Sequence, residues 1–130
     1  MEALIVLQAY APYGLTILRI SLGTIFLVHG WQKFAMWNMK PSEQMPSSML
    51  SMMKTLSIVE TIAGFALIFG VFAQIAAVIT CIIMIGAIYF KTQKWGKKFT
   101  GDGGWEFDVI LLAASITVLL TGPGAIALLP

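Results

Sequence analysis

Apolar residues fill four long stretches of the chain, and the polar residues gather between these stretches. The four stretches cover residues 12–34, 52–72, 73–90 and 106–128, each close to the roughly 20 residues with which an α-helix crosses a bilayer. Only the pentapeptide GVFAQ at residues 70–74 joins the second to the third, so we expect a tight helical hairpin there. The pattern predicts an all-α polytopic membrane protein, a single domain over residues 1–130 that forms an antiparallel bundle of four transmembrane helices.

Composition agrees with a membrane location. Apolar residues make up 58% of the chain and charged residues only 11%, whereas about 25% of the residues of a soluble domain are charged. The N-terminal stretch carries the acidic Glu2 where a signal peptide would carry a base, and no small-residue cleavage site follows. We therefore expect this stretch to stay in the mature protein. A single cysteine, Cys81, excludes an intramolecular disulfide and a thiolate metal site, so we expect a buried, unreactive thiol and no bound metal.

The lysines and tryptophans indicate one orientation in the membrane, because they gather around the two polar loops at residues 36–48 and 91–104. The lysines are Lys33, Lys40, Lys54, Lys91, Lys94, Lys97 and Lys98, and the tryptophans at the same boundary are Trp31, Trp37, Trp95 and Trp105. Positively charged loops face the cytoplasm, and tryptophans mark the membrane–water interface. We expect an integral protein of a prokaryotic cytoplasmic membrane, with both long loops in the cytoplasm and both termini outside.

The first apolar stretch carries three basic side chains on one side of its helix. At about 100° per residue, Arg19, His29 and Lys33 fall within one sector, with Gly23 and Gly30 beside them. Glycines on that side let a second helix approach closely. The basic face is therefore predicted to point into the protein. For Lys33 an interfacial anchor is an equal alternative, and for His29 a hydrogen-bonded core residue is one.

Acidic residues in the other stretches provide partners for these bases. Glu60 lies near the middle of the second stretch, one turn before Gly64, at a depth that we estimate to be within about one turn of Arg19. We therefore predict an Arg19–Glu60 ion pair. Glu106 opens the fourth stretch at a depth close to that of His29, and a helix N-terminal acid is its alternative role. Asp108, on the other side of that helix, is expected to meet lipid headgroups.

Three segments resemble the DoxX/DoxD family of small four-helix membrane proteins. They are RISLGTIFLVHGWQKF at residues 19–34, VETIAGFALIFGVFAQIAAVI at residues 59–79 and GDGGWEFDVILLAASITVLLTGPGAIAL at residues 101–128. After TGPG the chain continues with AIALLP, where the family often carries an aromatic residue and an aspartate. The resemblance implies a membrane subunit linked to quinone or sulfur redox chemistry, as in an archaeal thiosulfate:quinone oxidoreductase.

From charge and depth we expect a quinone site at the cytoplasmic mouth of the bundle. A quinone needs an apolar slot, donors for its carbonyl oxygens and a proton path. Catalytic roles in proton transfer fall to His29, Glu60 and Glu106, and the residues expected to bind the quinone are Arg19, Phe26, His29, Trp31, Lys33 and Trp105. A small anion would instead suit the end with His29 and Lys33.

The chain has no ligand pattern for bis-histidine haem, an iron–sulfur cluster or a dinucleotide. We expect no covalently bound cofactor, and electrons would pass directly to quinone or through a partner. The expected partners are membrane lipid, quinone or a small anion, and a redox-enzyme subunit or a second copy of the chain, without nucleic acid. Two alternatives stay open: an assembly or anchoring subunit of a redox complex, and a small proton-linked transporter.

Overall fold

A computed structural model describes all residues 1–130 and contains helices and no strands. Helix α1 (Glu2–Ile5), the 3₁₀ turn η1 (Val6–Tyr10) and helix α2 (Ala11–Lys33) follow one another without interruption. After them come the 3₁₀ turn η2 (Phe34–Met36), α3 (Ser47–Phe69), α4 (Ala73–Tyr89), the π-helical turn η3 (Phe90–Lys94) and α5 (Glu106–Thr121). The all-helical class and the four main helices agree with the prediction.

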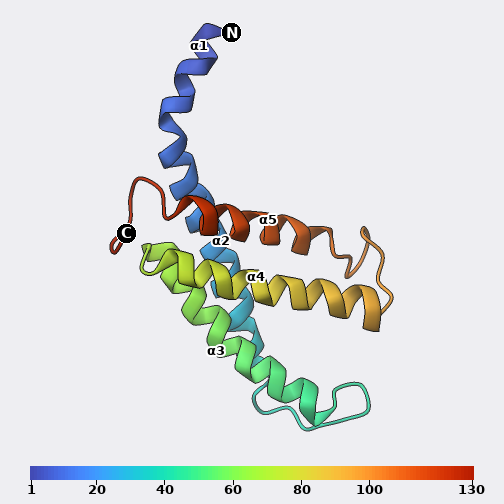
Figure 1. Ribbon diagram of the computed structural model, residues 1–130. Helices are drawn as coiled ribbons and strands as arrows, with labels where there is room; N and C mark the ends of the chain where they lie inside the picture. The colour runs from blue at the N-terminus through green and yellow to red at the C-terminus, as the bar shows by residue number, and fades with distance from the viewer.

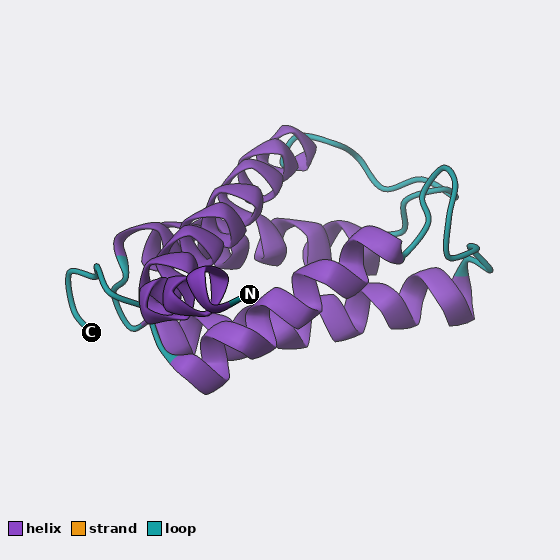
Figure 2. Cartoon of the chain, turned by 90° about the horizontal axis from the view of Figure 1, so that it is seen from above, coloured by secondary structure: helices purple, strands orange, loops and turns teal.

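The helices form two hairpins that meet at one end and diverge toward the other. Helices α2 and α3 pack side by side as one hairpin, and α4 and α5 form the second (Figure 1). The turn between α3 and α4 lies near the C-terminus, whereas the two long loops lie at the opposite, wider end (Figures 1 and 2). As predicted from the sequence, both lysine-rich loops share one end of the molecule.

Three of the helical segments are long and apolar enough to cross a membrane, namely Glu2–Met36, Ser47–Phe69 and Ala73–Lys94. The fourth predicted stretch, 106–128, is helical only over Glu106–Thr121. At 1.5 Å per residue this helix is about 24 Å long, less than the roughly 30 Å of a hydrocarbon core. Gly122, with φ of +85°, and Pro123 end the helix, because neither residue continues α-helical geometry here. The apolar tail beyond them is not helical.

Pro46 and Gly70 set the ends of α3. The helix begins at Ser47, directly after Pro46, which is earlier than the predicted start at residue 52. It ends at Gly70 in the left-handed conformation with φ of +70°, the usual C-terminal cap. Helix α4 begins at Ala73, so only three residues separate the two helices. The predicted tight hairpin is confirmed.

Small residues bring the backbones of α2 and α3 into contact. A Cβ atom built on Gly23 would lie 2.7 Å from the carbonyl oxygen of Gly64, and one built on Gly64 would lie 2.6 Å from the nitrogen of Leu27. These distances leave no room for a side chain. The predicted close contact at Gly23, Gly30 and Gly64 is therefore present, and it turns the basic face of α2 toward α3.

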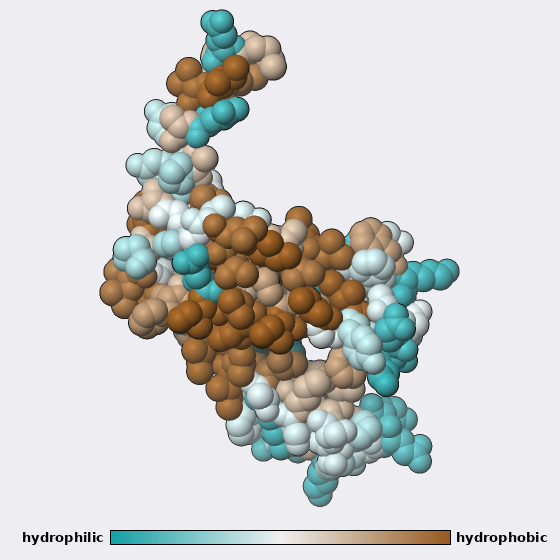
Figure 3. Space-filling model, viewed as in Figure 1, coloured by the Kyte–Doolittle hydropathy of each residue, from teal (hydrophilic) through white to brown (hydrophobic).

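Apolar side chains cover the outside of the helices, and polar ones gather at the loops (Figure 3). The exposed apolar residues of α3 and α4 include Ile58, Ile62, Phe65, Phe69, Ile75, Val78, Ile82 and Ile85. Arg19 and Glu60, by contrast, are 2% and 3% exposed, and Cys81 is buried as well. The charges of Arg19 and Glu60 thus avoid the surface that lipid would cover. The segment before α2 projects from the bundle with all its residues exposed (Figure 1).

Candidate functional site

Arg19 lies at the narrow end of the molecule, enclosed by backbone carbonyl groups. Its Nε donates a hydrogen bond to the oxygen of Leu67 at 2.7 Å, and its Nη1 donates to the oxygens of Pro123 and of Ile126, the latter at 2.7 Å. Leu67 is in the last turn of α3 and Pro123 follows the end of α5, where helix dipoles favour a positive charge. Arg19 therefore fastens the C-terminal tail to α2 and α3.

The predicted Arg19–Glu60 ion pair is wrong, because the two residues lie at different depths. A Cβ atom on Gly30 would lie 3.0 Å from the Cβ of Glu60, so these two positions face each other across the hairpin. Arg19 is eleven residues before Gly30 on α2, which corresponds to about 16 Å along the axis. The prediction placed Glu60 about three turns too far from the loops, since the register of the two helices was unknown.

Glu60 pairs with Lys33 instead. The Lys33 Nζ donates to Glu60 Oε2 at 2.7 Å, and the side chain of Glu60 is only 4% exposed while that of Lys33 is 22% exposed. Lys33 occupies the last turn of α2, one turn beyond the Gly30 contact. The lysine that the sequence left open between an anchor and a functional role is therefore a counter-ion inside the bundle.

A second ion pair joins the other hairpin. Lys91 Nζ lies 2.7 Å from Asp108 Oδ2 and 3.4 Å from the carbonyl oxygen of Gly104. Lys91 comes from η3, a π-helical turn, and such turns often occur at functional sites. No donor points at Asp108 Oδ2 in hydrogen-bonding geometry, so this buried oxygen keeps acceptor capacity beyond the ion pair.

Glu106 and Asp108 exchange the roles that we predicted for them. Asp108 is 6% exposed and does not reach the surface, whereas Glu106 is exposed. The buried face of α5 consists of Asp108, Leu111, Ser115 and Val118, at helical spacing, and Glu106 lies on the opposite side. The expectation that Asp108 meets headgroups and Glu106 enters the site is therefore wrong.

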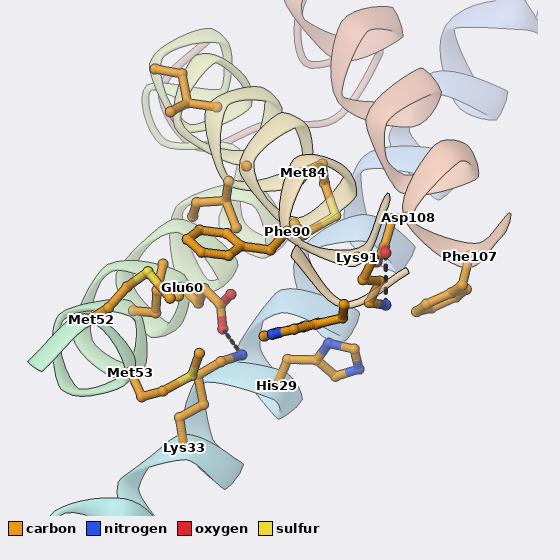
Figure 4. A pocket seen from close by; sticks show the side chains of 16 residues that line it. His29, Lys33, Met52, Met53, Glu60, Met84, Phe90, Lys91, Phe107 and Asp108 are labelled. Carbon is orange, nitrogen blue, oxygen red and sulfur yellow. Dashed lines mark hydrogen bonds and ion pairs between the residues drawn. The ribbon is translucent and has the colours of Figure 1, made fainter. Parts of the chain in front are cut away.

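Both ion pairs belong to the wall of a cavity of about 450 Å³ between the diverging hairpins. Figure 4 shows the Lys33–Glu60 pair beside Met52 and Met53, and the Lys91–Asp108 pair on the opposite side of this space. The full lining consists of His29, Lys33, Met52, Met53, Leu56, Glu60, Ile82, Ile83, Met84, Gly86, Ala87, Phe90, Lys91, Trp95, Phe107 and Asp108. All the main helices contribute, so the cavity exists only in the folded bundle.

His29 is the titratable side chain of the cavity that takes part in neither ion pair. Its ring is partly exposed and lies against Phe107, with 6.1 Å between the ring centroids. An imidazole can donate or accept a proton near neutral pH. Nowhere in the chain do three or more His, Cys, Asp or Glu side chains form a group that could hold a metal ion. The cavity thus combines an imidazole with an apolar space.

Comparison with known proteins agrees with this architecture. The sequence profile of the DoxX family matches residues 14–93. The chain belongs to the DoxX family. The match begins in the first turn of α2, includes the rest of the α2–α3 hairpin and all of α4, and ends within η3. DoxX membership and the three helices long enough to span a bilayer identify the chain as an integral membrane protein.

Two relatives of this DoxX protein extend along nearly its whole length. A Bacillus subtilis (strain 168) protein named "Putative oxidoreductase CatD" is 36% identical over 120 residues, which cover 90% of this chain and 85% of the relative. An uncharacterized protein of Haemophilus influenzae is 27% identical over 124 residues, covering 94% of this chain and 92% of the relative. No solved structure matches significantly.

Only part of the predicted site of this DoxX protein comes together. His29, Lys33 and Glu60 line the cavity as expected. Arg19, Phe26, Trp31, Trp105 and Glu106 are not among its lining residues. Phe26 is buried in the core, Trp31 is 68% exposed, and the Trp105 ring packs on Phe99. Arg19 is too far from the cavity along α2, and Glu106 lies on the outer side of α5.

The sequence analysis missed Lys91, Asp108 and the apolar lining from α3 and α4. Asp108 was detectable, because Leu111, Ser115 and Val118 continue its side of the helix at spacings of three and four residues. Lys91 was assigned to the surface with the other loop lysines, since nothing in the sequence marks the π-helical turn that directs it inward.

Proposed function

We propose that this DoxX protein is a quinone-binding subunit that supports a membrane redox reaction. The observation behind this proposal is the cavity at the wide end of the bundle, which combines an apolar interior with His29 and two ion pairs. Binding sites for small hydrophobic ligands have this form, with few polar groups that orient the ligand in a mostly apolar space. The name of the Bacillus relative, "Putative oxidoreductase CatD", fits the same class of reaction.

The charges of the cavity favour a neutral ligand over a free anion. Lys33 is neutralised by Glu60 and Lys91 by Asp108, each at 2.7 Å, so neither lysine offers an uncompensated positive charge. An anion such as thiosulfate would lose its hydration and gain little in return. A quinone ring carries no charge, and the aromatic and thioether side chains of Phe90, Trp95 and Met52 suit it.

The side chains around the ring would handle its protons. Reduction of a quinone adds two electrons and two protons. His29 would donate one proton to a ring oxygen, and water at the loop end would supply the second proton and reprotonate His29. Asp108 Oδ2 is able to accept a hydrogen bond from a quinol hydroxyl. The electrons come from a partner subunit or a soluble donor. A sulfur compound would be oxidised at that partner and not in this chain. The chain itself then binds, orients and protonates the quinone.

A quinone titration of the purified protein in detergent tests this proposal. Quinones quench tryptophan fluorescence at close range, and Trp95 lines the cavity. The wild type should show saturable quenching by decylubiquinone. His29→Ala should weaken binding about tenfold, as expected for one lost hydrogen bond of ~1.4 kcal/mol, with an unchanged unfolding midpoint.

Gln32→Ala is the matched control, because Gln32 lies on the same turn of α2 but is exposed and does not line the cavity. It should titrate like the wild type. Equal affinity of His29→Ala and wild type would show that the site is misplaced. If the wild type shows no saturable quenching, the protein does not bind the quinone and the proposed function is wrong.

An assembly or anchoring subunit is the second candidate. All these charges, Arg19 and the two ion pairs, have partners within the chain. A role in holding the helices together would therefore explain them without any ligand. Stoichiometric co-purification with a redox enzyme, together with failure to bind quinone, would support this function over the first.

We also propose the sidedness of the protein. Both lysine-rich loops lie at one end of the molecule, and the positive-inside rule assigns that end to the cytoplasm and the two termini to the outside. In this arrangement α5 is the fourth crossing, and the apolar tail 122–130 fills part of the outer leaflet. The cavity then lies in the cytoplasmic half of the membrane.

A further inference from the structure

We infer that the ligand enters the cavity sideways from the hydrocarbon layer, through an opening between α3 and α4. This inference rests on the proposed function and adds the route and the physical form of the ligand. The ligand would be a neutral ring with an apolar tail, dissolved in the membrane, with the ring inside the cavity and the tail left in the opening.

The distribution of polar groups in the cavity supports this route. Among the lining residues on α3 and α4, the one exposed side chain is apolar, namely Ile82, which is 65% exposed. Glu60 and Asp108, by contrast, have side chains that are only 4% and 8% exposed. A mouth that opened to water would carry polar residues at its rim and apolar ones inside. Here the order is reversed, as expected for a mouth that faces lipid.

The position of Ile82 places this mouth within the membrane. Ile82 lies near the middle of the spanning segment Ala73–Lys94. It is eight residues from Phe90, which corresponds to about 12 Å along the axis. The opening therefore extends from the depth of Ile82 toward the loops, between the neighbouring faces of α3 and α4. Figure 3 shows the surface hollowed in this region, below α4.

The loop before α5 closes the cavity at the wide end. The ring of Trp95 packs on that of Phe90 with 5.9 Å between the centroids. The backbone N–H of Trp95 also donates a hydrogen bond to the carbonyl oxygen of Phe90. Lys91 holds the carbonyl of Gly104 from the same loop at 3.4 Å. These contacts cover the side from which a water-soluble ligand would arrive, so the lateral opening is the more direct way in.

Gly86 provides a way to block the opening without disturbing the fold. It lines the cavity, yet a Cβ atom built on it meets no heavy atom within 4 Å. A leucine there would occupy empty space between α3 and α4. Gly14 on α2 has the same free surroundings but does not line the cavity, so Gly14→Leu is the matched control.

The test uses the protein in liposomes and two quinones, decylubiquinone and the same ring without a tail. The readout is the quenching of Trp95 alone, obtained as the difference between each protein and the same protein with Trp95→Phe. We expect saturable quenching of the wild type by decylubiquinone and a loss of affinity of about tenfold, or ~1.4 kcal/mol, in Gly86→Leu. Gly14→Leu should match the wild type. The tail-less ring should bind weakly and equally to the wild type and to Gly86→Leu, because its contacts at His29 are untouched.

Two outcomes would overturn the lateral route while the quinone site stands. One is a decylubiquinone affinity that Gly86→Leu leaves unchanged. The other is equal binding of the two quinones from water, which would show that the tail contributes nothing. If neither quinone gives saturable quenching that depends on Trp95, the proposed function fails and the lateral route fails with it.

Discussion

Single buried charges in this protein are compensated in two different ways. The carboxylates of Glu60 and Asp108 are each matched by a lysine at 2.7 Å. Arg19 has no carboxylate near it and is instead surrounded by carbonyl dipoles from α3 and from the C-terminal tail. A guanidinium group suits this role because its fork of donors can reach several carbonyls at once. The charge of Arg19 is therefore a structural element at the end away from the cavity.

Replacing Arg19 by methionine should destabilise the protein while leaving the cavity intact. The substitution keeps an apolar chain but removes the donors for the carbonyls of Leu67, Pro123 and Ile126. Each buried carbonyl left without a partner costs about 1–3 kcal/mol. We expect a loss of about 3 kcal/mol in unfolding by dodecyl sulfate in mixed micelles. Ser21→Ala, at an exposed position of the same helix, should have no effect. Unchanged stability of Arg19→Met would contradict the assigned role.

For single charged residues, the sequence predicted burial in the protein better than it predicted the partner of each charge. Arg19 and Glu60 were expected to face the protein interior, because their helix faces carry glycines, and both are buried. Lys33, for which an interfacial anchor was an equal alternative, pairs with Glu60. Their pairing depends on the register between helices, and a shift of about eleven residues is about 16 Å along an axis. Single-residue contacts between helices need this register, which the sequence does not contain.

Among the helices, α2 and α3 form the tightest unit. Their glycines allow direct backbone contact, as at Gly23 and Gly64. In a bilayer, such close packing replaces the hydrophobic driving force that is missing between helices. The α2–α3 hairpin is therefore the more closely packed half of the molecule, and it carries His29, Lys33 and Glu60.

A methyl group at this contact should weaken the hairpin. In Gly23→Ala the new Cβ would lie within 2.8 Å of backbone atoms of Gly64 and Ile68, so the helices would have to separate. Overpacking of this kind costs about 1–3 kcal/mol, which the same dodecyl sulfate titration would measure. Gly14→Ala makes the same chemical change where a Cβ meets nothing, and it should be neutral. If the two variants unfold at the same detergent fraction, the backbone contact does not limit stability.

The helices themselves were predictable, and their ends only in part. Runs of about 20 apolar residues need no tertiary information to be recognised. The tight turn at residues 70–72 was also visible, because no polar loop separates the two runs. The end of α5 was not, since the apolar residues after Gly122 suggest a longer helix than the backbone conformation of Gly122 allows.

The molecule as a whole is a pair of hairpins joined at a single turn. Because the hairpins diverge from that turn, they lie close together at the narrow end and enclose the cavity at the wide end (Figure 1). Trp31 and Trp105 are outside the lining of the cavity, although both lie at the end that we predicted for the site. Apolar patterning indicates which faces turn inward but not the angle between two hairpins. The region of the site was therefore predictable, and much of its lining was not.

The orientation in the membrane can be tested with single cysteines in a Cys81→Ala background. Gln8→Cys should react with a membrane-impermeant maleimide added to intact cells. Ser42→Cys and Thr100→Cys, one in each long loop, should react only after the membrane is opened. The expected pattern follows from the lysines around both loops. Labelling of Ser42→Cys in intact cells would show the opposite orientation, with the cavity in the outer half of the membrane.

The clamp around Arg19 also imposes an order on biosynthesis. Arg19 is translated early, whereas the carbonyls of Pro123 and Ile126 lie 104 and 107 residues later in the chain. Until that segment leaves the ribosome, only carbonyl groups of α3 can accept hydrogen bonds from the guanidinium group in the first helix. A chain interrupted directly after α5 would contain every helix but would lack these two acceptors.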